Sequence, residues 1–84
     1  MIGQIAKLTK EQRRRAYFSN IPIGTFFIIT EKHESMPAYD LTGYFLNIKP
    51  QILKDGTPYF FGYIEKGSWE LVGNLTDNIG ILKR

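Results

Sequence analysis

The residues that could support catalysis or metal binding are few in this chain. It has no cysteine and one histidine among 84 residues, which excludes thiolate catalysis, disulfides and cysteine-based metal sites. The histidine lies in the charged run Glu31-Lys32-His33-Glu34. Two carboxylates and an imidazole could bind a divalent cation. In a strand, however, His33 would point away from Lys32 and Glu34, so we interpret the run as a solvated strand end that enters a loop.

Nucleophiles and phosphate-binding loops have no supporting motif either. Ser19, Ser35 and Ser68 lie at predicted element boundaries, where serine is favoured because it hydrogen-bonds the backbone. None of them lies in a Gly-x-Ser-x-Gly sequence, and no glycine-rich strand-to-helix turn is present. We therefore predict that the chain is not an enzyme, with no catalytic residues, no metal ion, no cofactor and no small-molecule substrate.

The most pronounced charged motif is the triplet Arg13-Arg14-Arg15. Guanidinium groups bind phosphates in a bidentate manner. Successive helix positions are about 100° apart, so three consecutive arginines spread over about 200° and cannot all face one groove. The net charge of +3 is also common among proteins that bind no polyanion. A solvated helix face, a contact with a polyanion and a contact with an acidic protein all stay open for the triplet.

Aromatic residues make up 14% of the chain, and three of them alternate along one predicted strand. Tyr59, Phe61 and Tyr63 would form a stripe on one side of that strand. Exposed rings beside positive charge hold single-stranded nucleic acid through base stacking. Aromatic alternation on a strand is more often a sign of a core or of a protein interface, and we favour that reading.

Two kinds of element are expected to position these residues. The sequence Thr9-Lys10-Glu11-Gln12 is typical of a capping box and predicts a helix over 10–18 that ends before Pro22. From Gly24 onward the hydrophobic period is two, which predicts strands. The predicted strands cover 25–32, 43–49, 59–65, 68–75 and 79–83, with a long loop over 33–42 and a two-residue hairpin turn at Asp55-Gly56.

These elements predict one domain over 1–84, with an N-terminal arm and helix over 1–23 and a five-strand meander over 24–84. The fold class is mainly β, of the β-barrel or α+β kind. The layout of five antiparallel strands resembles the SH3-like small barrel, here with a short N-terminal helix. Phe26 and Ile28 would point to one side of the first strand and Phe27 and Ile29 to the other. A small barrel needs one apolar face per strand, so we expect a partner or the helix to cover the outer face.

The sequence therefore predicts a small protein–protein binding module, an accessory or regulatory protein that docks on a larger assembly through an apolar, aromatic outer sheet face. Its partner would be another protein or a second copy of the chain. The alternative is a nucleic-acid-binding small barrel. Without a signal-peptide pattern or an apolar run long enough for a membrane span, we expect a cytoplasmic protein that does not enter a membrane. The candidate binding residues are Arg13, Arg14, Arg15, Tyr59, Phe61 and Tyr63.

Overall fold

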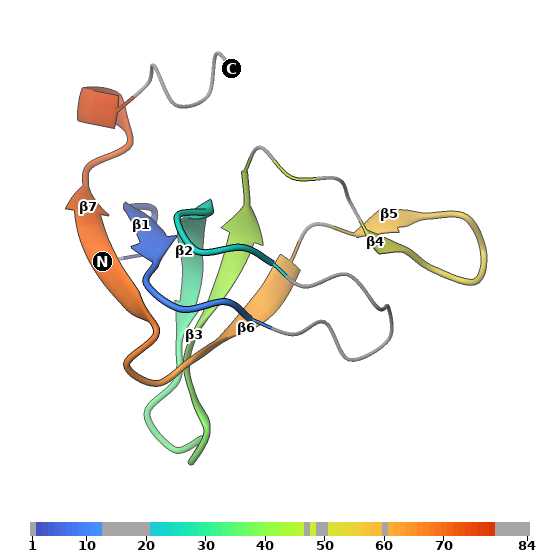
Figure 1. The fold of residues 1–84 in the computed structure, drawn as a ribbon, viewed down its shortest axis with the longest axis horizontal. Helices are drawn as coiled ribbons and strands as arrows, with labels where there is room; N and C mark the ends of the chain where they lie inside the picture. The colour runs from blue at the N-terminus through green and yellow to red at the C-terminus, as the bar shows by residue number, and fades with distance from the viewer. Residues whose placement is uncertain (1, 13–20, 47, 49–50, 60, 79–84) are drawn as a thin grey trace.

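A computed structural model describes residues 2–12, 21–46, 48, 51–59 and 61–78 of the chain (Figure 1). Strands dominate this part of the chain, as the hydrophobic period of two from Gly24 onward predicted. The strands are β1 (Ile5–Leu8), β2 (Phe26–Lys32), β3 (Tyr39–Phe45), β4 (Gln51–Ile52), β5 (Pro58–Tyr59), β6 (Phe61–Glu65) and β7 (Trp69–Gly73). The mainly β fold class is therefore confirmed.

Five of the strands form one antiparallel sheet in the order β6-β3-β2-β1-β7. Strands β4 and β5 form a separate hairpin, which projects to one side of the sheet (Figure 1). The five-stranded antiparallel sheet was predicted, but its order is not that of a meander, because β1 lies between β2 and β7. Strands β6 and β7 end the sheet on opposite sides, so the sheet is open rather than closed into a barrel.

The predicted helix over 10–18 is wrong at its start. Gln12 and Ile21 exchange backbone hydrogen bonds of 2.9 and 2.7 Å and form an antiparallel bridge, so the chain is extended there. A capping box is a local signal, and pairing with a distant segment overrides such signals. The rest of the predicted helix, including Arg13, Arg14 and Arg15, lies outside the described residues.

Strand β3 begins four residues before its predicted start, so the predicted loop over 33–42 is wrong at its end. Leu41 is buried in the core, but Tyr39, Asp40 and Thr42 around it hide the alternation that would have marked a strand. Strand β7 falls within the predicted 68–75 strand. The predicted strand over 79–83 lies outside the described part of the chain.

The core lies on the inner face of the sheet. Phe27 and Ile29 of β2 are fully buried there, while Phe26 and Ile28 on the other side are half-buried, so both faces of this strand are apolar as predicted. The buried apolar residues of the core are Ile5, Ala6, Leu8, Ile21, Phe27, Ile29, Leu41, Phe45, Leu46 and Ile64.

Two glycines allow the aromatic core to pack tightly against the sheet. Gly43 of β3 and Gly62 of β6 lie opposite each other in the register. The ring of Phe27 occupies the space that a side chain at Gly43 would need, and the ring of Phe45 does the same at Gly62. The two rings meet in an edge-to-face arrangement with centroids 6.2 Å apart. Each phenylalanine thus covers the glycine of the neighbouring strand.

The hairpin between β4 and β5 has a longer loop than predicted. Gly56 N–H donates to the Leu53 carbonyl, and Leu53 N–H donates to the Thr57 carbonyl, each over 2.9 Å. This pattern places Lys54 and Asp55 at the centre of the turn, so Asp55-Gly56 is not a two-residue turn. Gly56 has a φ of +88°, as expected of a glycine that follows a type I turn.

The hairpin loop is reinforced by the Asp55 carboxylate. Its Oδ1 accepts a hydrogen bond of 2.9 Å from the Thr57 N–H. Hydrogen bonds from the Thr57 side chain and from its backbone lower the pKa of Asp55, because they stabilise the ionised form. These bonds contribute at neutral pH and are lost as the pH falls through the lowered pKa.

We expect Gly56→Val to weaken this hairpin by about 1 kcal/mol or more, because a β-branched residue is strained at a positive φ. Hydrogen exchange of the Leu53 amide should then be about fivefold faster, while amides of the five-stranded sheet keep their protection. Gly56→Asn is the matched control, because asparagine tolerates the left-handed region. Equal exchange in the valine variant and the parent would contradict the assigned turn.

Candidate functional site

A row of exposed aromatic rings follows β5 and β6. Tyr59, Phe61 and Tyr63 are 42%, 39% and 51% exposed. Ile64, the next residue of β6, is fully buried on the opposite side, because side chains alternate along a strand. The sequence predicted this stripe, and its rings point away from the core.

The neighbouring strand β3 extends this row into a two-strand surface. Tyr44 lies opposite Phe61 in the register, and their ring centroids are 5.2 Å apart at 82°. Tyr59 contacts Phe61 at 5.9 Å, and Tyr39 contacts Tyr63 at 5.3 Å. We call these five residues, Tyr39, Tyr44, Tyr59, Phe61 and Tyr63, the aromatic face.

Sequence reasoning found only part of this face. Of the two adjacent aromatic residues of β3, Tyr44 belongs to this face, whereas Phe45 is 3% exposed and belongs to the core. Tyr39 was missed because it fell in the predicted loop. Leu41, Gly43 and Phe45 recur with a period of two, and this signal could have extended the predicted strand backward to Leu41. A register shift between Tyr39 and Leu41 interrupts that period, so no alternation indicates that Tyr39 contacts Tyr63.

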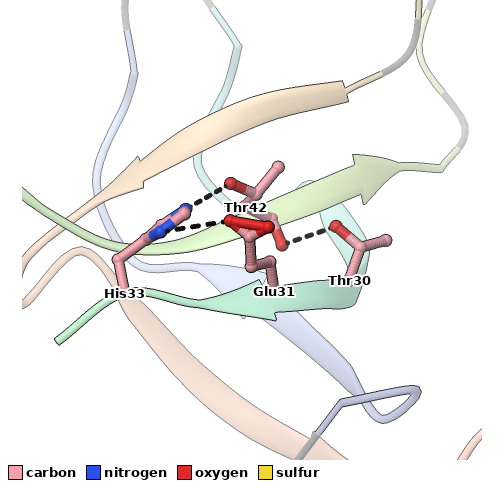
Figure 2. Close-up of polar contacts among 4 residues, drawn as sticks. All are labelled: Thr30, Glu31, His33 and Thr42. Carbon is pink, nitrogen blue, oxygen red and sulfur yellow. Dashed lines mark hydrogen bonds and ion pairs between the residues drawn. The ribbon is translucent and has the colours of Figure 1, made fainter.

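His33 lies at one end of the aromatic face, immediately after β2 (Figure 2). Its Nε2 is 2.5 Å from Thr42 Oγ1, and its Nδ1 is 3.3 Å from Glu31 Oε1. Its ring centroid is 5.6 Å from that of Tyr63. The hydroxyl of Thr30 donates to the Thr42 carbonyl over 3.0 Å. The end of β2 is thereby tied to β3 and β6.

The predicted solvated strand end is therefore wrong for its central residue. The side chain of Glu31 is 63% exposed, whereas that of His33 is 13% exposed. Residues two apart in an extended segment point to the same side, and the spacing of Glu31 and His33 could have revealed their contact. The contact between Glu31 and His33 was overlooked because the run was considered as a metal site formed by both carboxylates and the imidazole together.

The contacts of His33 resemble part of a hydroxyl–imidazole–carboxylate relay. Acyl transfer also needs free backbone donors for the developing oxyanion. Thr42 lies inside β3, between β2 and β6, where the strand backbone is engaged in sheet pairing. No group of three metal-ligating side chains occurs in the part of the chain that the structure describes. We therefore interpret the cluster as a structural tie that fixes Tyr63.

Charged groups around the sheet are mostly engaged with neighbours. Lys7 Nζ lies 3.0 Å from Glu70 Oε1 across β1 and β7. The indole N–H of Trp69 donates to Asp40 Oδ2 over 3.0 Å. Among the described residues, Glu31 places a carboxylate near the aromatic face. It contacts His33, and the ring of His33 contacts Tyr63.

No protein-family model, curated protein or solved structure matches this chain. Within residues 2–12, 21–46, 48, 51–59 and 61–78, no helix has the length and apolar character needed to span a membrane. Any functional conclusion must therefore come from the surfaces of the molecule, of which the aromatic face is the most distinctive.

Proposed function

We propose that this chain is a small, non-enzymatic protein-binding module, an accessory or regulatory protein that docks on a larger assembly through the aromatic face. The observation that carries this proposal is the clustering of the rings: Tyr59 and Tyr44 each contact Phe61, and Tyr39 contacts Tyr63, the next residue but one along β6. Tyrosine and phenylalanine are enriched at the centres of protein interfaces. They offer a large apolar area with little conformational entropy to lose on binding.

The fold does not need these exposed rings for its core. Ile64, Leu41 and Phe45 fill the inner face of the same two strands and are nearly inaccessible to solvent. Three rings of the outer face keep 39–51% of their area exposed. Soluble monomers seldom leave a contiguous apolar patch of large area uncovered unless it binds something. A protein surface that contributes apolar side chains and hydroxyl partners suits this composition.

The alternative is a nucleic-acid-binding barrel that uses Arg13, Arg14 and Arg15 together with the same rings. Two features favour a protein partner. The edge of one ring covers a face of the other in an edge-to-face pair such as Tyr44–Phe61, so less flat surface is left for a base to stack on. The carboxylate of Glu31, held at His33 beside Tyr63, would repel a phosphate backbone.

We also propose that the sheet is an SH3-like small barrel left open between β6 and β7. Two contacts support this: Thr9 N–H donates to the Ser68 carbonyl over 2.8 Å, and Gln12 hydrogen-bonds the backbone of β6. The segment from Thr9 to Gln12 thus lies along the gap that a closed barrel would seal with strand pairing.

Capture of partners from a cell lysate tests the proposal when single-residue variants are compared. Phe61→Glu places a charge in the middle of the aromatic face. Leu53→Glu is the matched control, because Leu53 is 38% exposed against 39% for Phe61 and lies in the loop of the β4–β5 hairpin, outside the aromatic face. We expect the parent and the control to retain a protein partner after nuclease treatment. Phe61→Glu should weaken that binding by about 30-fold, the loss of about 2 kcal/mol expected at an aromatic hot spot.

The same variants separate the two functions. Oligonucleotide titrations at low salt should show no binding that depends on Phe61. If the parent binds a single-stranded probe, Phe61→Glu abolishes that binding and no protein capture depends on Phe61, then the protein-binding proposal is wrong and the nucleic-acid alternative holds.

A further inference from the structure

The two outer edges of the five-stranded sheet differ in how their backbone groups are satisfied. At β6, the side-chain amide of Gln12 donates to the Tyr63 carbonyl, and its oxygen accepts from the Glu65 N–H over 3.3 Å. Gln12 is 5% exposed. One glutamine thus occupies the place of a paired strand and covers part of that edge.

The edge formed by β7 has no such cover among the described residues (Figure 1). The Ser68 carbonyl accepts from Thr9 on the β1 side, and Glu70 lies opposite Lys7 of β1. Successive residues of a strand direct their N–H and C=O groups to opposite sides. The backbone groups of Trp69 and Leu71 therefore face away from β1, at the outer edge of the sheet.

The side chains along this edge are unusually apolar. Leu71 is 47% exposed and Val72 is 37% exposed. The charge of Glu70, the acidic residue of β7, is matched by Lys7 at 3.0 Å. Edge strands are normally protected by unpaired charges, proline or a covering segment. An apolar strand with outward-facing hydrogen-bonding groups is a template for another strand.

We propose that β7 pairs with β7 of a second copy of this chain, antiparallel and about a twofold axis at Leu71. Leu71 then faces its own counterpart, and Glu70 of each copy faces Val72 of the other. The regular pairing ends there, because β7 has a register shift against β1 between Leu71 and Gly73 and Gly73 has a φ of +147°. No like charges lie opposite each other, so the strand is complementary to itself, as an isologous contact requires. Because the backbone of Leu71 points outward, the two leucines exchange two N–H···O=C bonds. The aromatic face, at the other end of the sheet, stays available in the dimer.

Sedimentation and light scattering of the full chain at micromolar concentration test this dimer. The parent should have twice the 9.7 kDa mass of one chain. Leu71→Lys places a charge where the leucines would meet, so the variant should be monomeric. Its unfolding midpoint should not depend on protein concentration, whereas that of the dimeric parent should rise with concentration. Phe61→Glu is the control, because it alters only the aromatic face and should remain dimeric. A monomeric parent, a dimeric Leu71→Lys variant or a monomeric Phe61→Glu variant would each overturn the proposed interface.

Disulfide trapping tests the register independently of stability. The chain has no cysteine, so Leu71→Cys introduces a single thiol per copy. In a hydrogen-bonded antiparallel pair the two Cα atoms would be about 5.5 Å apart, which is within the range that a disulfide spans. Val72→Cys is the control, because each copy's residue 72 faces residue 70 and the two thiols are offset. Oxidation should cross-link Leu71→Cys about tenfold faster or more, and equal rates would refute the axis at Leu71.

Discussion

Replacing Gly43 with alanine is expected to lower the free energy of unfolding by about 2 kcal/mol, within the range known for overpacked cores. An added Cβ would lie 2.5 Å from Phe27 Cδ2, 3.1 Å from Cγ and 3.3 Å from Cβ. Because the β2 backbone fixes Phe27 Cβ, which lies 3.3 Å from the added methyl group, side-chain rotation alone cannot remove every close contact. Phe27 is fully buried, so any movement disturbs the core.

Thermal unfolding measures this effect. For a domain of this size, 1 kcal/mol corresponds to about 4–8 °C, so Gly43→Ala should unfold about 10 °C earlier. The control is the same change in a Phe27→Val background, because valine lacks Cδ2, the atom of the closest contact at 2.5 Å. The substitution should then cost at least about 1 kcal/mol less, a coupling typical of residues in contact. If alanine costs the same in both backgrounds, the ring of Phe27 does not enforce glycine at this position.

The inner and outer sides of the sheet follow from alternation in the sequence, but the role of the glycines does not. Phe27 and Ile29 were separable from Phe26 and Ile28 because side chains two apart share a face. A glycine inside a strand often marks a bulge or a close approach, and Phe45 does lie against Gly62. Gly43 was taken as the first residue of a strand, because the ring that covers it comes from another strand.

The order of the strands in the sheet could not be predicted from the sequence, because local patterns do not specify which strands pair. Ile5–Leu8 is only four residues long and was grouped with an N-terminal arm. It pairs with β2 on one side and with β7 on the other, and the pairs with β7 join residues more than sixty positions apart. A turn signal predicts hairpins between successive strands, and it carries no information about such long-range neighbours.

Only part of the aromatic face could be predicted from the sequence, for a related reason. The stripe of Tyr59, Phe61 and Tyr63 lies within the single predicted strand over 59–65, where it is recognisable as a period of two. The contributions of Tyr39 and Tyr44 depend on the register between β3 and β6, which no local pattern fixes. The contact of His33 with Tyr63 depends on the same register, so no local pattern indicates that the histidine supports this face.

Gln12 is the residue whose predicted and observed roles differ most, and its replacement should have the second large effect. The sequence predicted that its side chain caps a helix. In the structure it hydrogen-bonds Tyr63 and Glu65 of β6. Gln12→Met keeps the volume and leaves that carbonyl and N–H without their partner. An unsatisfied buried group costs about 1–3 kcal/mol, so we expect a total loss of about 3 kcal/mol in urea unfolding.

Gln4→Met is the matched control for this loss. The amide of Gln4 donates to Asn74 Oδ1 over 2.9 Å at an exposed position, where water can replace the bond. A change at such a site should cost less than about 0.5 kcal/mol. Equal stabilities of Gln12→Met and Gln4→Met would show that the contact at the β6 edge contributes nothing.

The charge variant Gln12→Glu tests which atoms of the amide matter. The introduced carboxylate can accept from the Glu65 N–H but cannot donate to the Tyr63 carbonyl, and burial further disfavours its charge. Protonation restores the donor, so its pKa in the folded state should lie above the ordinary value of about 4.3. Stabilisation by the protonated form is then complete below that ordinary value and is lost as the pH rises through the raised pKa. Measured against the parent from pH 4 to 8 in urea, the variant should lose stability toward neutral pH. A constant difference between the two proteins would mean that Tyr63 does not need the donor.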